Sequence, residues 1–226
     1  MNYLHVFYSN KGKYFDFIKK YKKESNCIKF YCIEDAINSN LSFFERDTVY
    51  LLLNDLEMIN KFINKYKGKV RILNQNFYEM KLSKLDVQNL LYKHSYNVPK
   101  IMDKNDFDKC YFKENNHQGF SQVINSAFEA KQVIKTNKVK SFYLEEYISF
   151  DREIKLYYVF DKLYSKDIEC LDSDKYKDIA KILSLDIMSI DILIKDDIYY
   201  LIDVNASPGL YHCDEGLTYF IKRIIL

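Results

Sequence analysis

The chain has 226 residues, of which 48% are hydrophobic, and its 34 basic and 32 acidic residues leave a formal net charge of +2. A charge balance of this kind gives no support for binding to nucleic acid or to a membrane surface. No apolar run is long enough to span a bilayer. The length predicts one compact unit, or two small lobes that share a core.

The cysteines and the first ten residues bear on the compartment. Residues 1–10 lack the charged and apolar segments of a secretory leader. The cysteines are odd in number, scattered and without a CxxC pair, which predicts free thiols in a reducing cytoplasm rather than a disulfide framework. They are Cys27, Cys32, Cys110, Cys170 and Cys213.

The first part of the chain predicts a small α/β lobe. Short apolar runs at residues 3–8, 27–33, 48–53 and 70–73 are typical of buried strands, and the segments between them are more polar and mostly helical. Strands that alternate with helices in this way favour a parallel sheet.

A helix is predicted from Ser83, which forms a plausible capping box with Asp86. The helix should end before Pro99, because the residue before a proline avoids the helical conformation. A strand at residues 109–113 and a polar loop at residues 114–119 follow, and then a further strand and a helix at residues 127–135.

The second half of the chain predicts a largely antiparallel sheet with one helix. The expected strands cover residues 142–148, 153–160, 162–169, 187–194 and 198–204, and the helix covers residues 174–185. Residues 195–197 form a short polar, hairpin-like turn between the last two strands.

Two polar side chains at the end of the last strand suit a hard cation. Asp203 and Asn205 are two residues apart, so they share one face of the strand, while Ile202 and Val204 face the core. Carboxylate and carboxamide oxygens are ligands that Mg²⁺ accepts, usually together with phosphates. Pro208 then ends the strand ladder.

Asp191 adds a third oxygen ligand from the neighbouring strand. It lies between isoleucines in an apolar strand, where a carboxylate is costly to bury unless a cation or a metal compensates it. One interpretation is a three-ligand metal site with Asp203 and Asn205. The alternative is that a lysine or backbone amides satisfy Asp191.

Residues 185–193, followed by residues 203–210, resemble the C-terminal signature of the ATP-grasp ligases. The resemblance is closest to the branch that contains the ribosomal-protein glutamate ligase. In that family the acidic and amide residues of the signature hold Mg²⁺ that bridges the ATP phosphates. The resemblance therefore implies that Asp191, Asp203 and Asn205 bind Mg²⁺, with Asp203 at a position where the family more often has Glu.

Upstream segments resemble the family's nucleotide-binding segments, in the same order. Residues 83–85 resemble the start of the linker helix, and residues 111–113 resemble a strand; in both, the family has a lysine that contacts the phosphates. Residues 144–148 resemble the hinge strand, where backbone groups read the adenine edge and an acidic side chain binds the ribose. The nucleotide-binding residues that the resemblance implies are Lys84, Lys113, Glu145, Glu146, Tyr147 and Ile148.

Lys155 is the catalytic residue that the resemblance implies. Residues 153–159 resemble the strand after the hinge, where the family has an arginine that meets phosphate or substrate. A lysine keeps the charge but lacks the bidentate fork of arginine.

Two segments depart from the family pattern. The family usually has a long loop before the helix at residues 174–185, which closes over the reacting groups, and here only residues 170–173 remain. The phosphate-covering loop at residues 114–119 has a single glycine, although backbone amides approach phosphate most easily at glycine. His117 in this loop is a further donor, or an incidental surface residue.

The resemblance implies an ATP-grasp fold of the α/β (α+β) class. A pre-ATP-grasp α/β lobe would cover residues 1–80 and the ATP-grasp region residues 81–226. Within that region the linker helix and central lobe would cover residues 81–145, and the C-terminal lobe residues 146–226.

The implied activity is an ATP- and Mg²⁺-dependent ligase that joins a carboxylate to an amine through an acyl-phosphate, with ADP and phosphate as products. Small-molecule or peptide acids and amines are the expected substrates, and a second copy, a peptide or a carrier protein is the expected macromolecular partner. Two alternatives stay open: a non-catalytic module that binds a nucleotide or a partner, and phosphotransfer to a small acceptor without ligation.

Overall fold

The computed structural model describes residues 2–9, 21, 25–104, 107–117, 119–165 and 173–225. Cys170, most of the segment that is shortened relative to the family, and the end of the strand predicted at residues 162–169 lie outside the described residues.

The chain forms two compact units, each built from more than one segment. The first unit contains residues 1–81, 156–189 and 205–226, and the second contains residues 82–155 and 190–204. The first boundary lies beside the one predicted at residue 80, and two later segments join the unit of the N-terminal sheet. The predicted division at residues 145 and 146 stays a prediction.

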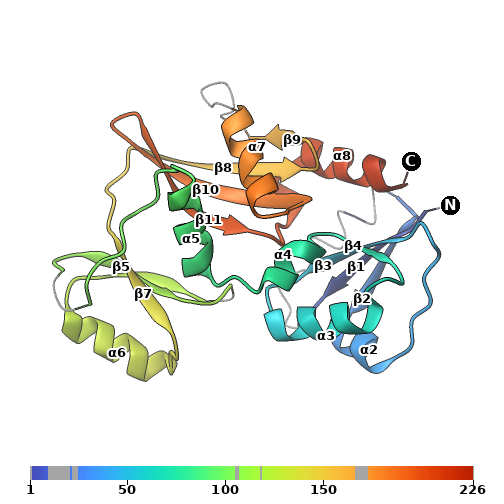
Figure 1. Ribbon diagram of the computed structural model, residues 1–226, viewed down its shortest axis with the longest axis horizontal. Coiled ribbons are helices and arrows are strands. Elements are labelled where there is room, and N and C mark those ends of the chain that lie inside the picture. Colours follow the sequence, from blue (N-terminus) through green and yellow to red (C-terminus); the bar gives the residue numbers. More distant parts are fainter. Residues whose placement is uncertain are drawn as a thin grey trace. The chain divides into compact units, whose positions relative to one another are not determined.

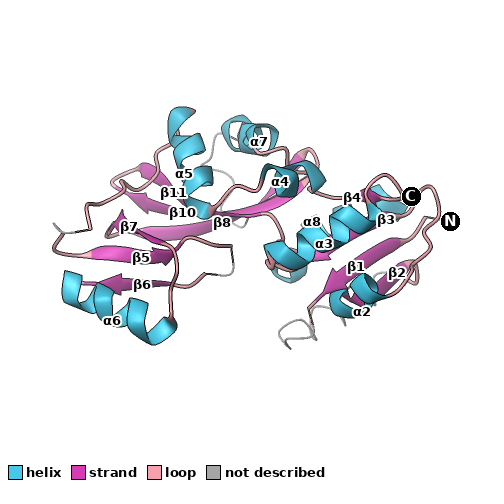
Figure 2. Ribbon diagram, turned by 60° about the horizontal axis from the view of Figure 1, so that its bottom comes forward, coloured by secondary structure: helices cyan, strands magenta, loops and turns pink. Residues whose placement is uncertain are grey.

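The first unit is built on a four-stranded parallel sheet in the order β2-β1-β3-β4 (Figures 1 and 2). These strands and the helices between them are β1 (Leu4–Tyr8), β2 (Ile28–Cys32), α2 (Ile33–Asn38), β3 (Thr48–Leu52), α3 (Leu56–Tyr66), β4 (Arg71–Ile72) and α4 (Gln75–Met80). The parallel α/β lobe predicted from the apolar runs therefore exists, with each strand within two residues of its expected bounds.

Successive strand residues point to opposite sides of this sheet, so its apolar side chains lie on both faces. Helices cover both faces and bury them. On one face Phe7 contacts Phe62 of α3, with ring centroids 4.6 Å apart. On the other face Leu4 and Val6 share a buried cluster with Phe220 of the C-terminal helix α8 (Asp214–Ile225). The N-terminal strands and the C-terminal helix thus bury one core.

The second unit contains a three-stranded antiparallel sheet in the order β6-β5-β7. Helix α6 lies along this sheet (Figures 1 and 2) and buries Ala130 and Val133 against it. The elements are α5 (Lys84–Lys93), β5 (Cys110–Glu114), β6 (Ser121–Ile124), α6 (Ala127–Asn137) and β7 (Phe142–Glu146). Helix α5 ends at Lys93, earlier than Pro99 alone predicts, since Ser95 adopts a left-handed backbone conformation with φ 64°.

A third sheet has the order β11-β10-β8-β9, and residues of β8, β10 and β11 are divided between the two units. Its strands and the remaining helices are β8 (Arg152–Val159), β9 (Lys162–Tyr164), α7 (Ser173–Ile182), β10 (Ile187–Lys195), β11 (Ile198–Asn205) and the 3-10 turn η2 (Leu210–His212). Asp196 and Asp197 both have positive φ, 48° and 59°, as a two-residue hairpin turn of the primed type requires. The hairpin predicted at residues 195–197 is therefore correct.

The described cysteines are free thiols, as the sequence predicted. Among the helices that the structure describes, none is both long and apolar enough to cross a membrane.

Candidate functional site

Lys84 lies at the first position of helix α5, and its neighbours hold it there. Ser83 accepts a hydrogen bond from the backbone amide of Asp86, and the Asp86 carboxylate accepts one from the amide of Ser83, so the predicted capping box is present. Lys84 Nζ lies 3.6 Å from Asp203 Oδ1 on β11. The start of the helix therefore brings a lysine to a predicted metal ligand.

Lys113 approaches β11 from the other sheet of the same unit. Its ammonium donates to the carbonyl of Ile202 at 2.9 Å and forms an ion pair with Glu145 on the neighbouring strand β7. Both charged side chains are almost completely buried. Lys84 and Lys113, which the sequence predicted as phosphate ligands, thus converge on residues 202 and 203.

Glu145 forms an ion pair with Lys113 and is buried, so its carboxylate is not exposed to a nucleotide. Burial raises the pKa of the Glu145 carboxyl, and the attraction of Lys113 only partly offsets this effect. The buried Gln88 also hydrogen-bonds Glu145, and its Nε2 donates to the carbonyl of Pro99 at 2.7 Å. Glu145 therefore contacts a predicted phosphate ligand, and its assignment as a nucleotide ligand stays a prediction.

A small cavity of about 20 Å³ adjoins these groups within the second unit. This volume holds about one water molecule, so nucleotide phosphates would have to displace side chains to enter. The cavity is lined by Lys84, Val87, Gln88, Leu91, His117, Tyr143 and residues 201–204. His117 Nε2 lies 2.8 Å from the carbonyl oxygen of Leu82, so the loop histidine contacts the start of the linker helix.

Lys155 and Asp191 form a second lysine–carboxylate pair. Lys155 Nζ on β8 donates to Asp191 Oδ1 on β10 at 2.6 Å, with both side chains partly exposed. The sequence left open whether a metal or a lysine satisfies Asp191, and a lysine contacts it in the structure. Each predicted metal-binding carboxylate therefore has a lysine beside it.

The remaining hinge residues combine exposed and buried groups. Glu146 is more exposed than Glu145, and its backbone amide donates to the carbonyl of Lys100 at 2.8 Å. The ring of Tyr147 stacks on Tyr111 at 5.4 Å between centroids, and Ile148 is buried. Their roles in adenine binding stay predictions.

Asn205 ends β11 and belongs to the first unit. Its side-chain Oδ1 accepts a hydrogen bond from the backbone amide of Ser207 at 2.9 Å, which fixes the side chain against its own turn. An amide oxygen has two lone pairs, so Oδ1 can accept this hydrogen bond and also bind a cation.

The predicted metal ligands are all oxygen donors. Among the described residues no group of three or more His, Cys, Asp and Glu side chains could hold a metal ion. The predicted set instead combines two carboxylates with one carboxamide, all oxygen donors of the kind that Mg²⁺ prefers. Lysines lie beside both carboxylates and compensate their charge. The residues thus fit Mg²⁺ chemically.

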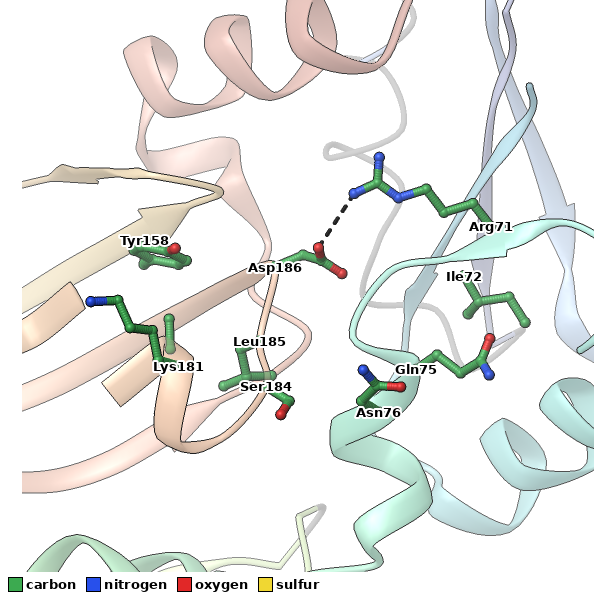
Figure 3. Close-up of a pocket in the computed structure, with 10 residues that line it drawn as sticks. Arg71, Ile72, Gln75, Asn76, Tyr158, Lys181, Ser184, Leu185 and Asp186 are labelled. Atoms are coloured by element: carbon green, nitrogen blue, oxygen red, sulfur yellow. Dashed lines mark hydrogen bonds and ion pairs between the residues drawn. The ribbon is translucent and has the colours of Figure 1, made fainter. Parts of the chain in front are cut away.

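A larger cavity, of about 500 Å³, lies within the first unit. Figure 3 shows Arg71 pointing toward Asp186, and the two are 3.3 Å apart. Lys181, the other lining cation, pairs with Asp178 at 2.7 Å. Both lining cations are thus paired with carboxylates on the same unit.

Sequence reasoning missed Gln88, Asn74 and Tyr78, whose polar side chains are buried and hydrogen-bonded. Gln88 is a polar residue on the apolar face of α5, and a polar residue at such a position could have been recognised in the sequence as a candidate buried hydrogen-bonding group. Asn74 and Tyr78 carry no such signal, since their partners lie more than 100 residues away in the chain.

Comparison with three solved structures identifies the fold of the chain. A D-alanine–D-alanine ligase from Bacillus anthracis complexed with ATP superposes with a TM-score of 0.73 at 15% identity, over 100% of this chain and 95% of that one. A RimK domain ATP-grasp protein from Sphaerobacter thermophilus gives 0.71 at 8% identity, over 99% of both chains. The ATP-grasp ligase PsnB, complexed with a minimal precursor variant, Mg and ADP, gives 0.65 at 14% identity, over 100% and 98%. The chain has the ATP-grasp fold.

The sequence is similar to that of the coenzyme γ-F420-2:α-L-glutamate ligase of Methanococcus maripaludis, with 27% identity over 71% of this chain. The chain spans 64% of the length of that curated relative. No protein-family model matches the sequence. The resemblance to ATP-grasp ligases predicted from the sequence is confirmed at the level of the fold, and the curated relative is itself a glutamate ligase.

Proposed function

We propose that the chain is an ATP- and Mg²⁺-dependent ligase that joins a carboxylate to an amine. The observation that carries the proposal is the convergence of Lys84 and Lys113 on Ile202 and Asp203. Two cations beside a carboxylate suit an ATP triphosphate with its metal, because phosphoryl transfer depends mainly on positioning and charge neutralisation.

In the proposed reaction a substrate carboxylate oxygen attacks the γ-phosphorus and the bond to ADP breaks. The amine nitrogen then attacks the acyl carbon and phosphate leaves, with the amine proton passing to water or phosphate. Lys84 and Lys113 would exchange their carboxylate and carbonyl partners for phosphate oxygens, and Lys155 would exchange Asp191 for the transferred phosphoryl group. Mg²⁺ on Asp191, Asp203 and Asn205 would neutralise charge on the phosphates.

The proposed substrates are an amino-acid or peptide acid and an amine. The similarity to a glutamate ligase supports glutamate as one substrate, and the fold shared with PsnB, which was solved with a precursor, supports a peptide as the other. The free thiols suit a reducing compartment, and we propose the cytoplasm.

The test is ADP release with Mg²⁺ and ATP across a panel of acids and amines that includes glutamate and short peptides. We expect release that requires one acid–amine pair and stops when the metal is chelated. In Asp203→Ala the rate should fall at least about 100-fold, because losing a metal ligand costs more than losing a residue that only hydrogen-bonds to a ligand. Asp108→Ala removes an exposed carboxylate of the same unit and should leave the rate unchanged.

The second candidate is a module that binds ATP without catalysis. It is favoured by the lysine beside each predicted metal-binding carboxylate, since such pairs can satisfy the carboxylates without a metal. ATP binding without Mg²⁺-dependent ADP release on any acid–amine pair would support this module and contradict the ligase. ADP release that requires one acceptor alone would instead indicate phosphotransfer without ligation.

A further inference from the structure

Asn74 is a buried polar residue in the short connection between β4 and α4 of the first unit. Only 1% of its surface is exposed, and its backbone lies in the left-handed region with φ 58°. This conformation is energetically unfavourable for any residue except glycine, although less so for asparagine than for most. Its side-chain contacts compensate for that cost.

The Asn74 carboxamide uses both its donor and its acceptor atoms. Its Nδ2 donates to the carbonyls of Ile187 and Ala206, at 2.7 and 2.6 Å. Its Oδ1 accepts from the amides of Asp186 and Ile187, at 2.6 and 3.1 Å. Ile187 begins β10, and Ala206 follows the last residue of β11. One side chain therefore links the start of one strand to the end of its neighbour.

Further contacts hold the same turn after β11. Tyr50 donates from its hydroxyl to the carbonyl of Pro208 at 2.6 Å. The hydroxyl of Tyr78 lies 2.6 Å from Ser207 Oγ, which donates to the carbonyl of Leu51 at 2.9 Å. Residues 206–208 are thus fixed by the N-terminal sheet and by the connection that carries Asn74.

This turn immediately follows Asn205, the predicted Mg²⁺ ligand of the first unit. The Asn205 side chain is oriented by the amide of Ser207, so its position depends on where residues 206 and 207 lie. A metal ligand whose orientation is set by a hydrogen-bonded neighbour loses affinity when that neighbour moves.

We propose that Asn74 is a positioning residue for the metal site, acting through the backbone of Ala206 to hold the carboxamide of Asn205 in place. This inference rests on the proposed function, since it assumes that Asn205 binds Mg²⁺ with ATP. Because the Asn74 carboxamide is engaged in four hydrogen bonds to backbone groups, its proposed role is to position the ligand and not to bind the metal.

The test measures the Mg²⁺ concentration at which binding of a fluorescent ATP analogue is half-maximal. Asn74→Gly keeps the left-handed backbone without cost and removes all four side-chain contacts. We expect it to need about 10- to 100-fold more Mg²⁺ than the wild type. Tyr66→Phe, which removes buried hydroxyl contacts to the carbonyls of Ala36 and Ser39, is the matched control and should need the same Mg²⁺ concentration.

A second variant keeps the test decisive if Asn74→Gly does not fold. Tyr50→Phe removes one hydrogen bond to the same turn and should raise the Mg²⁺ requirement by a few-fold. Amide hydrogen exchange of Ser207, measured without nucleotide, should be faster in the variants that perturb this turn than in Tyr66→Phe.

Two results would overturn the inference alone: a Mg²⁺ requirement that is unchanged in both Asn74→Gly and Tyr50→Phe, or unchanged exchange at Ser207. Wild-type protein that binds no ATP at any Mg²⁺ concentration would instead overturn the proposed function, and this inference with it.

Discussion

Three lysine side chains of the second unit lie beside acidic residues that the sequence predicted as ligands. Lys84 contacts Asp203, Lys113 contacts Glu145, and Lys155 contacts Asp191. The pairs differ in burial, and burial decides what each can do. A partly exposed pair can separate at little cost, whereas a buried pair loses several kcal/mol when one partner is removed.

Replacing Lys113 with Met tests the buried pair at the level of single residues. The variant should lose about 3–5 kcal/mol of unfolding free energy, because Glu145 would remain buried without a cation. Since burial already raises the pKa of Glu145, the loss should shrink as the pH falls and the carboxyl becomes neutral. Urea unfolding at several pH values measures both effects.

The double variant Lys113→Met with Glu145→Gln separates folding from ligand binding. It removes the unpaired charge and should regain most of the stability, but it should still bind ATP more weakly than the wild type. Wild-type ATP affinity in the double variant would show that Lys113 does not bind phosphate.

At the scale of elements, helix capping and turn geometry position the candidate functional side chains. Helix α5 begins at Lys84 because Ser83 and Asp86 satisfy each other's backbone amides. The β10–β11 hairpin turns at two aspartates with positive φ, and this tight turn keeps the strands of Asp191 and Asp203 adjacent. Local capping and turn geometry therefore determine where the helix and the strands that carry the candidate ligands begin and end.

Ser83→Ala should destabilise the chain by about 1 kcal/mol and also weaken ATP binding, because the first turn that carries Lys84 would fray. Ser126→Ala provides the comparison, since Ser126 caps α6 by accepting from the amide of Glu129. It should lose similar stability with unchanged ATP affinity. Urea unfolding and ATP titration of both variants check this; equal ATP affinity in Ser83→Ala would contradict a role for the start of α5.

At the scale of the whole molecule, the chain passes repeatedly between the two units. The first unit depends on a core that combines Leu4 and Val6 of the N-terminal strands with Phe220 of the C-terminal helix. The other face of the same sheet holds a buried hydrogen bond, in which His5 Nε2 lies 2.9 Å from Asp47 Oδ2. The stability of this unit therefore depends on residues from both ends of the chain.

We expect His5 to make the first unit sensitive to acid. Burial lowers the pKa of His5 more than Asp47 raises it, and Lys29 lowers it further. The unfolded imidazole, with its ordinary value of 6.5, thus binds a proton more readily than the folded one. The free energy of unfolding should therefore decrease as the pH falls below about 6.5.

Urea unfolding at pH 7.5 and 5.5 tests this expectation. His5→Gln should lose less stability over this interval than the wild type, because it removes the group that binds a proton more readily in the unfolded state than in the folded state. His94→Gln, at an exposed position, should behave like the wild type. An unchanged pH dependence in His5→Gln would contradict the role of His5.

The sequence by itself determined the strands of the N-terminal sheet, the hairpin, the capping box and the resemblance to ATP-grasp ligases. These features depend on neighbours within a few residues, or on short motifs that occur in a fixed order. Lys84, Lys113, Asp191 and Asp203 could be named for the same reason.

Only the tertiary structure decided which groups meet. It paired Glu145 with Lys113, placed Lys155 beside Asp191, and joined Asn74 to residues more than 100 positions away. Such pairings depend on how strands and helices pack, since burial requires each polar group to find a partner wherever the fold brings one. No local pattern specifies that partner.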